Sequence, residues 1–247
     1  MKTKMIHFTD SYAKECDSKV LSVSEFDGKI LVELDQTVFY PESGGQPTDV
    51  GTITTNKDGL EQTFQVSSAY KFQGKVLHVV DNKGLEEGNL VHCKIDWDVR
   101  YRNMHFHTAI HVITRLIERD TPIKVSSNNA SREKARIDFT LEDFDREFLG
   151  SFEAKANELI KKNIPVKTYI LSREEASKDP ELFRLSKGFD ESIQDIRIVQ
   201  IGPDENIFDK TACGGAHVAN TSEIPEIKFL KLENKGAKRR RINFTFI

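Results

Sequence analysis

The chain is 247 residues long, with 38% apolar and 30% charged residues and a mean hydropathy of −0.48. These values are typical of a soluble globular protein, and the length allows one large domain or two modest ones. No apolar run approaches the roughly 18–20 residues of a membrane helix, and the N-terminus has no apolar signal segment, so no membrane partner is expected. The net charge of −3 argues against a dedicated non-specific nucleic-acid binder, so any nucleic-acid contact must be local.

The three cysteines, Cys16, Cys93 and Cys213, form an odd number with no spacing typical of a disulfide framework. This usage favours a reducing compartment, and we therefore expect a cytoplasmic protein. In such a compartment a cysteine is more often buried, catalytic or metal-bound than bridged. The sequence indicates no obligate protein partner.

The first part of the chain has the pattern of β structure. Two β-rich runs, Val20–Phe26 and Lys29–Asp35, are separated by Asp27-Gly28, a dipeptide that favours a two-residue hairpin turn. Further short strands are predicted at Thr63–Phe72, Lys75–Val80 and Asn89–Asp96. Several short strands at this spacing predict a small barrel or sandwich.

The pattern changes near Trp97, where apolar residues recur at helical spacing and predict a helix from about Val99 to Glu118. A strand at Ala135–Phe139 is followed by Thr140-x-x-Asp143, which resembles a capping box and predicts the start of a second helix. A short helix with its own Ser-x-x-Glu box is expected after Ser172. Other strands are predicted at Val166–Leu171, Ile196–Ile201, Ile227–Leu232 and Arg241–Phe246.

Helices and strands alternate in this second half without repeated βαβ units, so the predicted fold class is α+β. The change of pattern lies near Asp96–Arg100. We therefore predict a β-barrel domain over residues 1–97 and a second domain over residues 98–247.

Two pairs of candidate metal ligands occur in the second domain. His107 and His111 are four residues apart on the predicted helix, so their side chains lie on one face and close enough to bind one ion. Far downstream, Cys213 and His217 have the same spacing around two glycines, which allow a tight non-helical backbone. Imidazole nitrogens with a thiolate suit Zn²⁺. Neither pair alone identifies a metal site, and only the two pairs together favour zinc.

The residue after the first histidine excludes one class of zinc enzyme. In metalloproteases with a His-Glu-x-x-His helix, that glutamate is the general base. Here the position is Thr108, which has no carboxylate. The metalloprotease interpretation therefore fails.

Three further stretches have distinctive sequences: the glycine-rich segment Phe39–Gly51, the stretch from Asp96-Trp97 to His107-Thr-Ala-Ile-His111, and Asp209-Lys-Thr-Ala-Cys-Gly-Gly-Ala-His-Val218. Together they resemble the alanyl-tRNA editing family, which is called AlaX when it is free-standing. Ala135–Phe139 and the closing strand near Arg239–Ile242 match the family as well. The resemblance covers nearly the whole chain in family order.

The resemblance implies a zinc-dependent aminoacyl-tRNA hydrolase with a small β-barrel followed by an α/β sandwich editing domain, in the medium-length free-standing form. Zinc ligands would be His107, His111, Cys213 and His217. The substrate would be the acceptor end of tRNA(Ala) charged with serine, with glycine as a second candidate. Residues that would contact this substrate are Thr108 as a gauge of the serine side chain, Gly44, Gly45, Gln46 and Arg136.

Two residues depart from the family pattern, and several roles stay open. Ala216 stands where the family usually has Thr, and Pro225 where it usually has Gly, so contacts beside the ligands are in doubt. Three protein ligands would leave a position on zinc open for chemistry, whereas four would close it. We favour an open position with His217 as the most loosely held ligand, and we identify no general base.

The basic segment Lys235–Arg241, with Arg100, Arg102 and Arg136, is a candidate for phosphate contacts or, equally, for surface ion pairs. Asp209 lies near the cysteine loop, where an aspartate more often caps or turns the chain. Two other functions remain open: an RNA-binding module with a structural zinc, and a zinc hydrolase of small esters or amides without an RNA partner.

Overall fold

The structure, a computed structural model, describes residues 3–57, 59–184, 192–236 and 238–247. It divides into two units, Met1–Arg102 and Asn103–Ile247, and the division falls inside one helix. Ala237, which belongs to the predicted basic segment, lies outside the described residues. Each unit is described by itself below.

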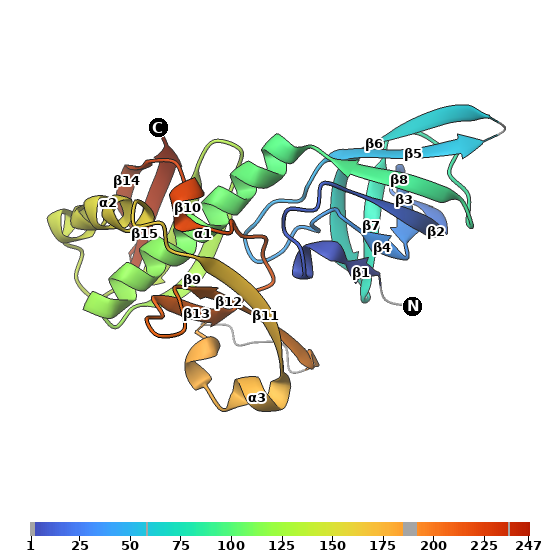
Figure 1. The fold of residues 1–247 in the computed structure, drawn as a ribbon. Helices are drawn as coiled ribbons and strands as arrows, with labels where there is room; N and C mark the ends of the chain where they lie inside the picture. The colour runs from blue at the N-terminus through green and yellow to red at the C-terminus, as the bar shows by residue number, and fades with distance from the viewer. Residues whose placement is uncertain (1–2, 58, 185–191, 237) are drawn as a thin grey trace. The chain divides into compact units, whose positions relative to one another are not determined.

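A closed six-stranded antiparallel barrel forms most of the first unit (Figure 1). The strands follow one another round the barrel in the order β2 (Glu15–Phe26), β3 (Lys29–Leu34), β7 (Lys75–Val80), β6 (Leu60–Phe72), β5 (Gly51–Lys57) and β8 (Leu90–Ile95). Burial alternates along β8, so every second side chain faces the barrel interior. Asp27 and Gly28 have φ of 51° and 71°, which confirms the predicted hairpin turn between β2 and β3.

A buried ion pair secures the loop that carries the glycine-rich segment. The Arg100 guanidinium donates from Nε to Asp49 Oδ2 at 2.9 Å and from Nη2 to the Val38 carbonyl at 2.6 Å. Both charged side chains are fully buried. A short strand pair, β1 (Lys4–Met5) with β4 (Gln36–Thr37), and a 3₁₀ turn at Ile6–Phe8 complete the first unit. Because Arg100 is buried and paired, its role is structural and it is not a phosphate contact.

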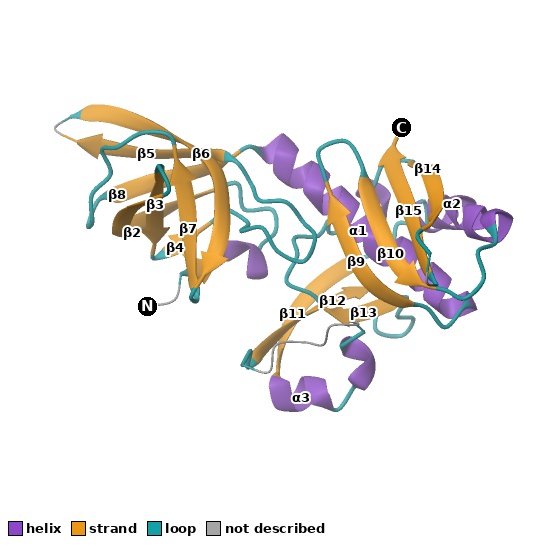
Figure 2. Ribbon diagram, turned by 180° about the vertical axis from the view of Figure 1, so that it is seen from behind, coloured by secondary structure: helices purple, strands orange, loops and turns teal. Residues whose placement is uncertain are grey.

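The second unit is built on α1 (Trp97–Asp120) and a four-stranded antiparallel sheet. The sheet has the order β14 (Ile227–Asn234), β15 (Arg239–Phe246), β10 (Ala135–Thr140) and β9 (Lys124–Ala130). Figures 1 and 2 show α1 along one face of this sheet, where the Phe106 ring stacks on Phe246 at a centroid distance of 4.4 Å. α2 (Arg146–Ile160) packs against β14.

A second sheet of the same unit has three antiparallel strands, β11 (Val166–Ser172), β12 (Asp195–Ile201) and β13 (Asp209–Ala212). The short helix α3 (Arg173–Ser177) follows β11, and Ser172 and Glu175 form the capping box that the sequence predicts. Single 3₁₀ turns lie at Pro180–Leu182 and Thr221–Glu223. A closed barrel with a mixed helix and sheet unit confirms the predicted α+β fold class.

The predicted capping box at Thr140 and Asp143 is wrong. Thr140 is the last residue of β10, where it pairs with Arg239, so its backbone belongs to the sheet. α2 begins later, at Arg146, and its N-cap is Asp145, whose side chain accepts the Phe148 N–H. Thr140 cannot be the N-cap because the sheet holds it in line with its strand, five residues before the true cap.

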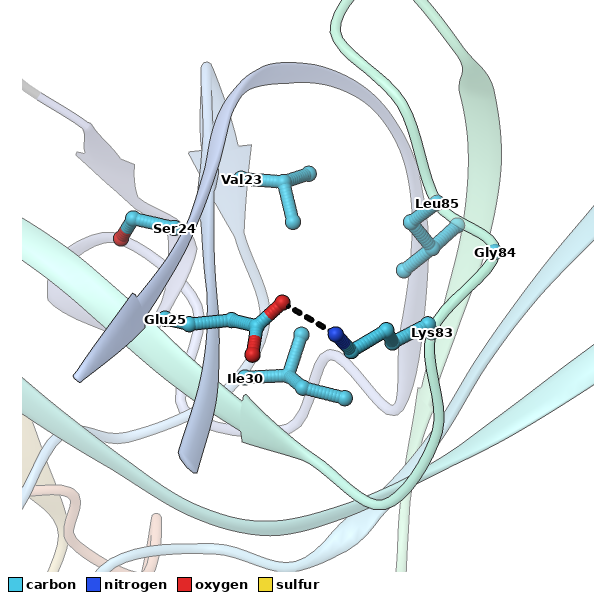
Figure 3. Close-up of a pocket in the computed structure, with 7 residues that line it drawn as sticks. All are labelled: Val23, Ser24, Glu25, Ile30, Lys83, Gly84 and Leu85. Carbon is cyan, nitrogen blue, oxygen red and sulfur yellow. Dashed lines mark ion pairs between the residues drawn. The ribbon is translucent and has the colours of Figure 1, made fainter. Parts of the chain in front are cut away.

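A hollow of about 330 Å³ lies on the barrel between the β2–β3 hairpin and the segment before β8 (Figure 3). Three apolar side chains and the ion pair between Glu25 and Lys83 line it. Both partners of that pair are largely exposed, so the hollow has no buried reactive group. Among the described residues, no helix is long and apolar enough to span a membrane.

Candidate metal centre

His107 and His111 occupy one face of α1, one helical turn apart. Their ring centroids are 5.4 Å apart, as expected for side chains at i and i+4. His107 is 5% exposed, and the His111 side chain is 11% exposed. The helix alone therefore places the two imidazoles side by side.

The other two candidate ligands come from the loop after β13. The Cys213 N–H donates to the Arg197 carbonyl at 3.0 Å, which extends the β12–β13 pairing by one residue. The loop then turns back toward α1, and a Cβ added at Gly215 would collide with the His107 ring. Glycine is required here for space beside the imidazole, rather than for the flexible backbone that the sequence suggested.

The four side chains converge on one point. Each offers one ligand atom, and these atoms all lie within 4.8 Å of one another. Cys213 Sγ is 3.4 Å from Nε2 of both His107 and His217. The ring of His217 lies 4.5 Å from that of His107 and 4.7 Å from that of His111, centroid to centroid. Residues more than a hundred positions apart in the chain thus form one cluster.

Thr108 orients the His217 ring. Its hydroxyl donates to the Met104 carbonyl at 2.9 Å and accepts from His217 Nδ1 at 3.1 Å and from the Val218 N–H at 3.3 Å. A hydroxyl has one donor and two acceptor sites, so all three are used. When His217 donates an Nδ1 proton to this hydroxyl, its Nε2 lone pair faces the cluster, 3.4 Å from the Cys213 sulfur.

Asp209 orients His111 in the same way. The Asp209 carboxylate is 2% exposed and accepts from His111 Nδ1 at 3.1 Å. Its other oxygen accepts from Arg184, which also donates to Glu118 at 2.5 Å. The sequence suggested a cap or turn for Asp209, but it begins β13 and holds a ring in place. A carboxylate behind a histidine is the usual support of a metal ligand.

The electrostatics favour the metal-binding forms of Cys213 and His217 and the protonated form of His111. Burial would raise the pKa of the Cys213 thiol, but His107 and His111 outweigh it and hold this pKa well below its ordinary value. Burial, together with His107, lowers the pKa of His217 to about 3. Burial would lower the pKa of His111, but Cys213 and Asp209 raise it to about 10. At neutral pH the cluster thus holds a thiolate and a neutral His217, and a metal would displace one proton from His111.

The cluster fits Zn²⁺ on its donor set and its spacing. Zinc–nitrogen and zinc–sulfur bonds of about 2.0–2.3 Å place the corners of a tetrahedron about 3.5 Å apart. Both sulfur–nitrogen distances of 3.4 Å agree with that spacing. Three imidazoles and one thiolate form a borderline-soft set of the kind that zinc prefers. His217 is held on its protein side as firmly as His111, so the geometry gives no sign that His217 is the loosest ligand.

Three of the other predicted contact residues, Gly44, Gly45 and Gln46, belong to the first unit. Gly44 and Gly45 have φ of 58° and 79° and form the tip of a two-residue turn bridged by Ser43 and Gln46. Gly44 is exposed, whereas Gln46 is 2% exposed. The glycines are thus needed for the turn itself, and Gly44 is open to contact from outside.

The predicted basic contacts are mostly engaged within the protein. Arg136 and Arg241 both pair with Asp138 on the four-stranded sheet, at 2.6 Å and 2.5 Å. Arg240 is 5% exposed, and Lys235 pairs with Glu233 at 3.0 Å. Arg102 is exposed on α1. The described part of the basic segment therefore forms a network of ion pairs more than an open cationic patch.

Ala216, which stands where the family usually has Thr, is fully buried beside the candidate ligand His217 in the chain.

Arg197 binds the cysteine loop and was not singled out from the sequence, whereas Asp209 was named there but given the role of a cap or turn. One signal was available: Arg197 is a charged residue inside the otherwise apolar run Ile196–Val199, and a buried charge in a strand requires partners. For Asp209 the sequence showed only that it lies near the cysteine loop, because its contact with His111 depends on how β13 meets α1.

The fold and the site place this chain in one class of protein. It has a β-barrel unit, an α+β unit and a candidate zinc centre of three histidines and one cysteine. The family model of class II (A) tRNA synthetases matches residues 3–99, and the model of the threonyl and alanyl tRNA synthetase second additional domain matches residues 196–243. The second model covers the cysteine loop but not α1.

Curated relatives match over the whole chain. An alanyl-tRNA editing protein AlaX-M of Methanosarcina barkeri is 44% identical over 250 residues, which is 99% of each chain. AlaX-M of Saccharolobus solfataricus is 37% identical and covers 98% of each chain. An alanine–tRNA ligase of Pyrobaculum aerophilum is 38% identical over 94% of this chain but only 25% of the ligase. The chain belongs to the AlaX-M family of alanyl-tRNA editing proteins.

Proposed function

We propose that this chain hydrolyses the ester bond of mischarged alanine tRNA, with Ser-tRNA(Ala) as the main substrate and Gly-tRNA(Ala) as the second. The observation that carries the proposal is the convergence of His107, His111, Cys213 and His217 in a member of the AlaX-M family. The reaction consumes one water and releases a free amino acid and a tRNA with its terminal hydroxyl restored.

Physical limits on selection explain why such an activity is needed. A pocket that accepts alanine cannot exclude the smaller glycine, and it rejects serine poorly because serine adds only a hydroxyl. Differences of this size give on the order of 10–200-fold selectivity. A separate hydrolytic site corrects the error when it requires a feature that alanine lacks.

The residues of the chain supply a preorganised site. His107 and His111 come from a rigid helix, and Thr108 and Asp209 fix the ring orientations of His217 and His111. A bound zinc would supply Lewis acidity toward the ester carbonyl or toward water. Asp209 is buried and already accepts from His111 and Arg184, so it is not the general base.

Thr108 is assigned to positioning and not to substrate contact. Its single donor and both acceptor sites are taken by Met104, His217 and Val218. A hydroxyl without a remaining site cannot also bind the hydroxyl of a substrate serine. We therefore place serine recognition in another residue.

The partner in this proposal is the acceptor end of tRNA(Ala), and the compartment is the reducing cytoplasm, in keeping with three free cysteines. Among the predicted contacts, Gly44 and Arg102 are exposed and remain candidates for the RNA. Such contacts would read shape and backbone with modest affinity.

Deacylation of Ser-tRNA(Ala), Gly-tRNA(Ala) and Ala-tRNA(Ala) by the zinc-loaded chain tests the proposal. We expect fast loss of the seryl ester, slower loss of the glycyl ester and little loss of the alanyl ester. Cys213→Ala should reduce seryl deacylation by on the order of 10²-fold or more, because a metal ligand is lost. Cys93→Ala is the matched control, since Cys93 is a buried thiol of the barrel core.

Two results would point elsewhere. Inertness toward all three esters with zinc bound would contradict the hydrolase and favour an RNA-binding module with a structural metal. Equal hydrolysis of simple amino-acid esters, without any advantage of tRNA, would favour a small-ester hydrolase.

A further inference from the structure

Arg197 is a buried cation in the middle of the three-stranded sheet. It lies on β12, which pairs with β11 on one side and β13 on the other, and it is 4% exposed. The neighbouring positions Ile196, Ile198 and Val199 are fully buried and apolar. A guanidinium in such a place is costly unless its donors are used.

The Arg197 side chain bonds to the cysteine loop at two points. Its Nη1 donates to the Cys213 carbonyl at 2.9 Å and to the Gly215 carbonyl at 2.7 Å. The backbone of the same residue binds the loop as well, because the Arg197 carbonyl accepts the Cys213 N–H at 3.0 Å. Arg197 thus contacts the first and third residues of the loop from within the sheet.

These contacts fix the two loop residues that touch the other ligands. Cys213 carries the thiol, and the Gly215 N–H donates to that sulfur at 3.4 Å. Gly215 also lies against the His107 ring without room for a Cβ. A shift of the loop would therefore move the sulfur and release the His107 ring together.

We propose that Arg197 is a positioning residue that holds the Cys213–Gly215 loop in the shape that places the thiolate in the metal cluster. It does not touch the metal or the substrate; it acts through the two carbonyls that it binds. The inference rests on the metal site of the proposed function, but it concerns metal binding alone, so it can fail while the hydrolase proposal stands.

The guanidinium suits this task better than another cation would. Its donors lie in a rigid planar fork, and its charge strengthens hydrogen bonds to carbonyl oxygens. A lysine ammonium has donors on a flexible stem and is more strongly hydrated, so it binds carbonyls in this buried place less well. A merely structural arginine would instead affect folding, with no specific effect on the sulfur.

Cobalt(II) is the probe, because its visible spectrum reports a bound thiolate by a sulfur-to-metal charge-transfer band. The full chain would be titrated with Co²⁺ and with Zn²⁺ as wild type, Arg197→Lys and Arg197→Met. Arg173→Met is the matched control, since the Arg173 guanidinium also donates to a carbonyl, that of Ile193 at 2.7 Å, but at the exposed end of the sheet. Thermal unfolding of each metal-free variant gives the structural readout.

We expect Arg197→Lys to fold, to lose most of the thiolate band and to bind Zn²⁺ roughly 10–100-fold more weakly, the range for losing the support of a metal ligand. Arg197→Met should lose at least as much, and Arg173→Met should match the wild type. A lysine variant with the full thiolate band and unchanged Zn²⁺ affinity would overturn the proposal. So would lysine and methionine variants that both fail to fold, since Arg197 would then serve the sheet as a whole.

If the wild type itself shows no thiolate band with Co²⁺, the metal site fails and the inference fails with it. If the wild type binds metal but deacylates no tRNA, only the hydrolase proposal fails. The Arg197 comparison keeps its meaning in that case, because it is read from metal binding.

Discussion

Two buried histidines, one in each unit, show how differently the same side chain is used. His78 in the barrel is fully buried; its Nδ1 contacts the Val32 carbonyl at 2.9 Å and its Nε2 the Thr37 hydroxyl at 2.8 Å. His217 in the second unit is 2% exposed; its Nδ1 contacts the Thr108 hydroxyl, and its Nε2 lies 3.4 Å from the Cys213 sulfur among the other candidate ligands. A histidine with both nitrogens hydrogen-bonded to the surrounding scaffold has a structural role. A histidine with one nitrogen directed at three other potential metal ligands is suited to bind a metal ion.

The buried arginines repeat the contrast. Arg100 pairs with Asp49 and also donates to the Val38 carbonyl, so these contacts all stay within the first unit. Arg197 binds two carbonyls of the loop that carries the candidate thiolate. In the barrel Arg100 and Asp49 satisfy each other, while in the second unit Arg197 supports the loop of a candidate cation site.

Replacing each histidine by alanine should give the largest difference between His217 and His78. His217→Ala removes a ligand, so Zn²⁺ affinity should fall by more than the roughly 100-fold upper range seen for losing a supporting group. His78→Ala leaves Val32 and Thr37 without partners and opens a cavity, so the barrel should lose about 2–4 kcal/mol with Zn²⁺ affinity unchanged. Metal titration and denaturant unfolding check both. Tight Zn²⁺ binding by His217→Ala would show that three ligands are enough.

Two glycines offer the next comparison. Gly215→Ala would drive a methyl group into the His107 ring, so Zn²⁺ affinity should drop about 10-fold or more although the backbone conformation suits alanine. Gly28→Ala meets no neighbouring atom but has φ of +71°, which should cost about 1–2 kcal/mol of barrel stability and leave metal binding intact. Metal titration and denaturant unfolding again provide the test. A Gly215→Ala protein that binds Zn²⁺ normally would show that Gly215 does not have to be glycine to fit beside the His107 ring.

The features of both units that depend on local residue spacing could be predicted from the sequence. The barrel strands around Asp27-Gly28 and the pairing of His107 with His111 on one helix follow from short-range periodicity. Strands β5, β9 and β13 were missed because runs such as Gly51–Lys57 and Asp209–Ala212 are polar or short, and their partners are distant. The contact between Thr108 and His217 could not be predicted, because the two residues are 109 positions apart and only the fold brings them together. Local rules likewise placed α2 too early, since they cannot know that Thr140 belongs to a sheet.

The threonines behind the two histidines test a smaller difference. Thr108→Val keeps the shape but removes the acceptor for His217 Nδ1, so the ring loses its fixed orientation and Zn²⁺ affinity should fall roughly 10-fold. Thr37→Val removes the hydroxyl bound to His78 and should cost about 1–3 kcal/mol of barrel stability without affecting Zn²⁺. Thr108→Ser, which restores the hydroxyl, should recover the affinity. A valine variant with wild-type affinity would show that Thr108 does not orient the ring.

The pH dependence of barrel stability gives the finest distinction. Burial lowers the pKa of His78 to about 4, from an ordinary value of 6.5 in the unfolded chain. Between these values the unfolded state binds more protons, so stability rises with pH and is lost as the pH falls from 6.5 toward 4. At pH 5 the loss from this one group should be about 2 kcal/mol relative to pH 7.5.

The single tryptophan, Trp97, packs against the barrel core, so its fluorescence during denaturant unfolding reports this unit. His78→Gln, which has no titrating group, should lose that part of the pH dependence, whereas His217→Gln should leave it unchanged. If both variants keep the wild-type slope, His78 is not the group that titrates. The distinction between a histidine closed within the fold and one open to a ligand would then rest on the metal titrations alone.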